Sequence, residues 1–61
     1  MLNQYDKIRL HTGERGAIVE IFKDGTFLAE IFRKTGEVEV TEIKQNEVKA
    51  RIVEIEEPLA V

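Results

Sequence analysis

Apolar residues recur at every second position in three stretches of the chain, with glutamates between them. A period of two is typical of a half-buried β-strand, whereas an amphipathic helix repeats every three to four residues. The three stretches therefore predict strands, and their apolar positions predict the side chains that face a core. These positions are Ala17, Val19, Ile21, Phe27, Ala29, Ile31, Val38 and Val40.

Turn residues stand where the alternation breaks. Asp24-Gly25 lies between two alternating runs, which is a strong hairpin signal, and we expect Gly25 to adopt a positive φ. Arg33–Gly36 is typical of a short hairpin loop. The predicted strands are Tyr5–Leu10, Ala17–Phe22, Thr26–Phe32, Glu37–Ile43 and Val48–Ile55, and the predicted single helical turn is Lys44–Glu47.

Five strands in so short a chain predict an all-β fold, a five-stranded antiparallel SH3-like small barrel with a short helical turn before the last strand. A flat sheet of this size would leave a face and two edges uncovered. We expect residues 1–56 to form the barrel domain and residues 57–61 a C-terminal tail. The predicted core is Ile8, Leu10, Val19, Ile21, Phe27, Ala29, Ile31, Val38, Val40 and Ile43.

The last predicted strand changes its pattern before it ends. Val48, Ala50 and Ile52 alternate, but Val53 and Ile55 fall on the opposite face. Either a β-bulge or a strand that leaves its own sheet to pair elsewhere explains this switch. The pattern leaves both explanations open.

Composition limits the chemistry that the chain can perform. Its 61 residues contain no cysteine and one histidine, which leaves the common zinc ligand sets unfilled and excludes disulfides. The glycines at 13 and 16 lack the lysine, serine and helix of a phosphate-binding loop. The glutamates at 37 and 39 are typical of a solvated strand face. We therefore expect no catalytic residue, no metal and no cofactor, and a protein that is not an enzyme.

Net charge and hydropathy limit the class of partner and the cellular location that we expect for the chain. Nine lysines and arginines against twelve aspartates and glutamates give a net charge of −3, which disfavours a surface that follows phosphates. Six of the nine basic residues lie within residues 1–34, so an anion-binding face would lie in that half. No apolar run reaches the roughly 20 residues that span a bilayer, and the N-terminus has no signal-peptide pattern. We expect a cytoplasmic protein without membrane contact.

A second set of apolar residues falls on the side that the alternation assigns to solvent. Contiguous exposed apolar surface on a small protein usually marks contact with a partner, and aromatic residues are enriched in such contacts. The candidate partner-binding residues are Tyr5, Phe22, Leu28 and Phe32.

Several segments resemble the opening of SH3-like barrels of the KOW and Tudor-like kind, in which a first strand and a glycine loop lead into a hairpin. The pattern is also similar to that of short bacterial one-domain proteins. The resemblance covers residues 4–48 and rests on Lys7–Leu10, Thr12–Gly16, Ile18–Ile21, Asp24-Gly25 and Phe27–Ile31. It implies a small barrel and, for the KOW kind, contact with RNA or the ribosome. The candidate nucleic-acid contacts are Lys7, Arg9, Arg15, Lys23, Arg33 and Lys34.

Two binding hypotheses follow. The first is a protein-interaction module, either a homo-oligomer or a small accessory subunit, that binds through its outward apolar face. The second is a KOW-like module that contacts RNA, which requires the basic residues to cluster on one face. The acidic balance of the chain places the RNA hypothesis second.

Overall fold

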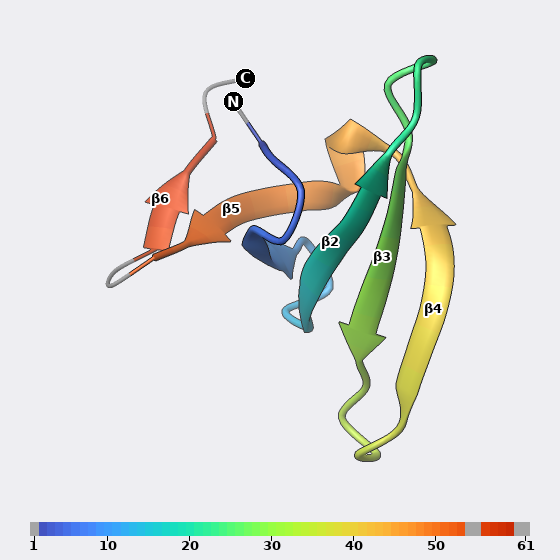
Figure 1. Cartoon of the computed structure of the whole chain (residues 1–61). Helices are drawn as coiled ribbons and strands as arrows, with labels where there is room; N and C mark the ends of the chain where they lie inside the picture. The colour runs from blue at the N-terminus through green and yellow to red at the C-terminus, as the bar shows by residue number, and fades with distance from the viewer. Residues whose placement is uncertain (1, 54–55, 60–61) are drawn as a thin grey trace.

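The computed structural model describes residues 2–53 and 56–59 and contains a single antiparallel sheet (Figure 1). The strands lie in the order β4-β3-β2-β1-β5-β6, and the sheet does not close, because β4 and β6 do not pair. The elements are β1 (Lys7–Leu10), β2 (Arg15–Ile21), β3 (Phe27–Phe32), β4 (Val38–Ile43), the 3-10 turn η1 (Gln45–Glu47), β5 (Val48–Ile52) and β6 (Glu56–Pro58). The five predicted antiparallel strands and the short helical turn before the fifth are confirmed.

The first four strands are joined by three hairpins of the same design. In each loop the N–H of the first residue donates to the carbonyl oxygen four positions later, and a glycine N–H donates back to the first residue's oxygen. The three glycines, Gly13, Gly25 and Gly36, have φ values of 92°, 89° and 92°. A three-residue loop that ends in a left-handed glycine matches the twist of the strands it joins. The predicted positive φ of Gly25 is therefore confirmed.

The sheet bends sharply between its two halves. Figure 1 shows β2, β3 and β4 side by side, while β5 runs across from η1 towards β6. β1 joins the halves, since it pairs with β2 on one side and with β5 on the other. The concave side encloses the core, and the convex side of β1–β4 is called the outer face below.

Residues from all of the first five strands form the core. Of the predicted core residues, Ile8, Leu10, Phe27, Ala29, Ile31 and Ile43 are buried, which confirms those six positions. Leu2 precedes the first strand and Leu59 follows the last, and both pack against the same cluster. The cluster of buried residues is Leu2, Ile8, Leu10, Ile18, Phe27, Ala29, Ile31, Ile43 and Val48.

The predicted facing of β2 is wrong for Ala17, Ile18 and Val19, because the strand contains a β-bulge. Ile18 pairs with Ala29 and Glu20 pairs with Leu28, so Val19 is the extra residue. Ile18 is completely buried, whereas Val19 is half-buried on the opposite side. Ile21 pairs with the buried Phe27 and so lies on the predicted side, but it is 40% exposed at the end of the strand. A bulge adds one residue to one strand and so shifts the alternation of its side chains. The period-two pattern of the sequence does not reveal such a shift.

The predicted facing of β4 is also wrong. Val38 and Val40 were expected in the core but are 56% and 57% exposed. Ile43 pairs with the buried Phe27, and this contact places the odd-numbered residues of β4 on the core side. Since side chains alternate along a strand without a bulge, the two valines point to the outer face.

Gly16 allows β2 and β3 to approach closely. A Cβ atom at this position would lie 2.6 Å from the carbonyl oxygen of Glu30 and 2.9 Å from Cδ1 of Ile31. Any other residue would push the two strands apart. The sequence prediction that Gly16 has a structural rather than a phosphate-binding role agrees with this geometry.

The C-terminal segment returns to its own sheet. β6 pairs with β5 through Ala50↔Pro58, Arg51↔Glu57 and Ile52↔Glu56. Residues 57 and 58, expected in the tail, therefore belong to a strand. The predicted last strand ends at Ile52. Of the two residues expected to switch face, Val53 follows the strand and is 54% exposed, and Ile55 lies outside the described residues.

Candidate interaction surface

Strand register determines which side chains meet on the outer face. Residues that pair directly across antiparallel strands point to the same side of the sheet. Two rows of side chains run from β1 to β4, and a third runs from β2 to β4. The rows are Lys7–Ala17–Glu30–Val40, Arg9–Arg15–Phe32–Val38 and Glu20–Leu28–Glu42.

Four apolar side chains of β3 and β4 gather on this face and are called the outer patch: Leu28, Phe32, Val38 and Val40. Phe32 pairs directly with Val38 and is 44% exposed. Val40 follows two positions after Val38 on the same face, and Leu28 is half-buried. An aromatic side chain opposite a β-branched one forms a favourable cross-strand contact, but here both still contact solvent.

The structure places the predicted partner-binding residues unevenly. Leu28 and Phe32 lie in the outer patch. Phe22 is half-buried opposite Thr26, whose oxygen accepts its N–H bond, and this register puts Phe22 on the same face near the β2–β3 loop. Tyr5 is 75% exposed, but its N–H donates to the oxygen of Ile18 from the side of β2 away from β3. Tyr5 is therefore not part of the outer patch.

Sequence reasoning missed Val38 and Val40, since it assigned them to the core. The sequence did show that this assignment was inconsistent. In a regular strand, Val38 and Val40 lie on one face and Ile43 on the other, so the three cannot share a core. The larger isoleucine occupies the buried position.

The predicted nucleic-acid contacts do not form one surface. Lys7, Arg9 and Arg15 share the corner of the outer face formed by β1 and β2, and Arg9 Nη1 also donates to the oxygen of Gly13 at 2.8 Å. Lys23 and Lys34 lie in hairpin loops at opposite ends of β3. Three of the six basic residues are therefore brought together.

Arg33, the sixth basic residue, is held by two carboxylates. Its guanidinium lies 2.8 Å from Glu14 Oε1 and 2.7 Å from Glu39 Oε1. The hydrogen bonds that Arg33 donates to Glu39 and, with a smaller effect, to Glu14 raise the pKa of Arg33 above its ordinary value. Its donors are therefore committed within the chain, which leaves it poorly placed to contact phosphate.

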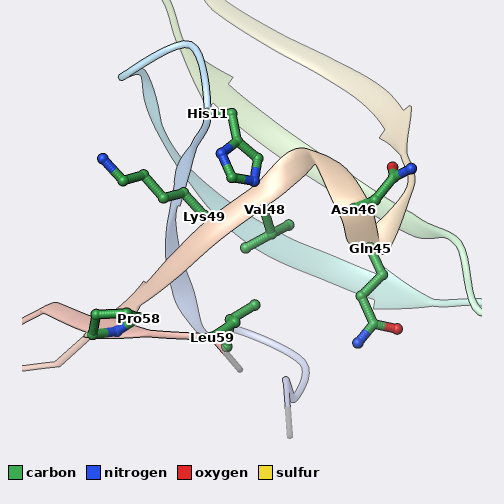
Figure 2. Close-up of a pocket in the computed structure, with 7 residues that line it drawn as sticks. All are labelled: His11, Gln45, Asn46, Val48, Lys49, Pro58 and Leu59. Atoms are coloured by element: carbon green, nitrogen blue, oxygen red, sulfur yellow. The ribbon is translucent and has the colours of Figure 1, made fainter. Parts of the chain in front are cut away.

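A hollow of about 520 Å³ lies on another part of the molecule, between the β1–β2 loop, η1, β5 and β6. Figure 2 shows the His11 ring and the amides of Gln45 and Asn46 around one end, with Pro58 and Leu59 on the side of β6. His11 is exposed in the β1–β2 loop, and its backbone N–H donates to the backbone oxygen of Glu47. Within residues 2–53 and 56–59 no group of side chains has the composition of a metal site.

The aspartate of the β2–β3 loop stabilises its own turn. Asp24 Oδ1 accepts bonds from the hydroxyl of Thr26 at 2.6 Å and from the Thr26 N–H at 3.0 Å. These bonds to the charged carboxylate lower the pKa of Asp24 below 3.8. An exposed carboxylate with a lowered pKa is a poor general acid or base, so this group has a structural role.

The part of the chain that the structure describes contains no helix with the length and hydrophobicity needed to cross a membrane. Comparison with protein-family models, curated proteins and solved structures gives no match. Sequence and structure therefore agree on a small all-β antiparallel domain, whose sheet is compatible with a small barrel.

Proposed function

We propose that this chain is a non-catalytic protein-interaction module, or a small accessory subunit, that binds another protein through the outer patch. The observation that carries the proposal is the exposed Phe32–Val38 pair, which is extended along β4 by Val40. A chain of 61 residues has few large apolar side chains to form its core. Leaving three of them in solvent, side by side, is a feature of a surface that a partner covers.

The arrangement of charge around the outer patch favours a protein over a nucleic acid as the partner. Glu30 and Glu42 border the patch on β3 and β4, and Arg15 borders it on β2. An apolar centre with charged groups of both signs at its rim is typical of transient protein interfaces. A phosphate-binding surface would instead need an excess of cations.

RNA contact by an SH3-like barrel of the KOW kind is the second candidate. The cluster of Lys7, Arg9 and Arg15 supports it, because these cations share one corner of the outer face. This hypothesis predicts salt-dependent RNA binding that is lost when the three are replaced by glutamine. The net charge of −3 and the internal pairing of Arg33 rank it below the first candidate.

The proposed function is tested by replacing Phe32 and Val38 together with serine. We expect the variant to keep its β-rich circular dichroism spectrum, because both side chains are partly exposed and lie outside the buried core. It should lose the partner that the unmodified chain recovers from cell extract, or lose self-association if light scattering shows that the partner is a second copy.

The matched control is Val53→Ser, which removes a valine that is 54% exposed and follows β5, away from the outer patch. This variant should associate as the unmodified chain does. Full association by the Phe32/Val38 variant would contradict the proposed function, and so would equal losses in both variants.

A further inference from the structure

The open edge of β4 offers backbone groups as well as side chains. β4 is the first strand of the sheet, and among the described residues its partner strand is β3 alone. The N–H of Arg33 donates to the oxygen of Glu37, and residues of an antiparallel strand direct their backbone groups alternately to either side. The odd-numbered residues of β4 therefore bond to β3, whereas Val38, Val40 and Glu42 direct their N–H and C=O groups to the open edge.

The same edge is acidic. Residues 37–43 contain three glutamates, Glu37, Glu39 and Glu42, and no lysine or arginine. All three glutamates are exposed, and only Glu39 bonds to a cation within the described residues, namely Arg33. Glu37 and Glu39 lie on the core side of the strand and Glu42 lies on the outer face, so an incoming strand would meet carboxylates on both faces, one of them paired with Arg33.

This charge separates two classes of occupant. Pairing of β4 with β4 of a second copy would place six carboxylates along one seam, and like charges across adjacent strands are destabilising. A strand with lysine or arginine beside Glu37 and Glu39 would meet opposite charge on that face, and its apolar residues would lie beside Val38 and Val40 on the other face. The acidic edge thus disfavours pairing with β4 of a second copy and favours pairing with a basic segment of a partner.

We propose that β4 binds a basic extended segment of a partner protein, which joins the sheet as an additional strand. The main-chain bonds of Val38, Val40 and Glu42 give affinity, and the glutamates give specificity for lysine or arginine. Apolar side chains of the segment lie beside Val38 and Val40 on the outer face. The inference rests on the proposed function, since it uses the same patch, but it names the partner's chemistry and mode of binding.

Two peptides of equal length probe this edge, one alternating lysine and valine and one alternating glutamate and valine. Amide exchange of the full chain is followed by NMR with each peptide. We expect the lysine peptide to protect the amides of Val38, Val40 and Glu42. The amides of Glu39, Thr41 and Ile43 should already be protected in the free chain, because they bond to β3.

Val40→Pro removes one outward N–H and places a ring in the seam. Proline is tolerated at an edge position whose N–H faces solvent, so the fold should remain. We expect binding of the lysine peptide to weaken by about tenfold or more, because a main-chain bond is lost and the incoming strand meets the ring. Val40→Ala keeps the N–H and is the matched control, with a smaller loss.

Glu37→Gln together with Glu39→Gln, on the face that the lysines would occupy, should also weaken binding of the lysine peptide and reduce its dependence on salt. Equal binding of the glutamate peptide would overturn the inference, as would protection confined to other strands. A third result would also overturn the inference. If the amides of Val38, Val40 and Glu42 are protected from exchange without peptide, and the mass of the protein rises with concentration, β4 pairs with a second copy.

The two proposals fail in distinguishable ways. If the partner is lost from the Phe32/Val38 serine variant but retained by Val40→Pro, the patch binds without an added strand and only the present inference falls. If the partner is retained by both variants, the proposed function falls as well.

Discussion

At the scale of single residues, Asp24 gives a clear expectation for pH. Its pKa is lower in the folded chain than the ordinary 3.8, because Thr26 donates two hydrogen bonds to the charged carboxylate. A carboxyl group with a lowered folded pKa stabilises the fold above its unfolded pKa. This stabilisation is lost as the pH falls through the folded pKa.

We therefore expect the NMR titration midpoint of Asp24 to lie below 3.8, and Thr26→Val to move it back towards that value. The difference in unfolding free energy between the unmodified chain and Asp24→Asn should shrink as the pH is lowered through this range. A midpoint above 3.8 would show that the loop does not hold the carboxylate as described.

At the scale of elements, the existence of the first five strands could be predicted, but β6 was expected as a tail and the facing of two strands was wrong. Alternation and turn residues located all five predicted strands and the η1 turn, because these signals are local. The bulge at Val19 is not local, since it depends on how β2 fits against β3. For β4, sequence gave equal weight to the two valines and Ile43, and packing against Phe27 decided between them.

The residues of the candidate site could likewise be predicted only where the local alternation is regular. Leu28 and Phe32 were found from sequence because β3 follows a regular alternation throughout. Val38 and Val40 were missed because their strand was assigned the opposite face. Which basic residues cluster could not be predicted either, since the pairing of Arg9 with Arg15 depends on the register of β1 and β2.

The corrected facing is tested by Ile18→Asp and Val40→Asp. Ile18 is completely buried, and an unpaired carboxylate there costs several kcal/mol against a total stability of about 3–5 kcal/mol for so small a core. We expect Ile18→Asp to be unfolded by circular dichroism and Val40→Asp to remain folded, since Val40 is 57% exposed. A folded Ile18→Asp variant or an unfolded Val40→Asp variant would contradict the facing.

At the scale of the whole molecule, the two edges of the sheet differ in kind. β6 spans three residues and ends at Pro58, which limits further pairing. β4 spans six residues without proline and is bordered by the exposed side chains of the outer patch. Self-association at β4 is opposed by its glutamates, so the open edge and the adjoining apolar face favour a different chain as the partner.

The central claim is that a protein partner covers the outer patch. The most direct measurement is the methyl NMR spectrum of the chain, labelled at valine and leucine, with and without the recovered partner. The account predicts that the methyl signals of Leu28, Val38 and Val40 shift or broaden on binding, while those of the buried Val48 and the exposed Val53 stay in place. Unchanged signals at Val38 and Val40, with changes confined to Val48 and Leu59 beside the hollow, would contradict it.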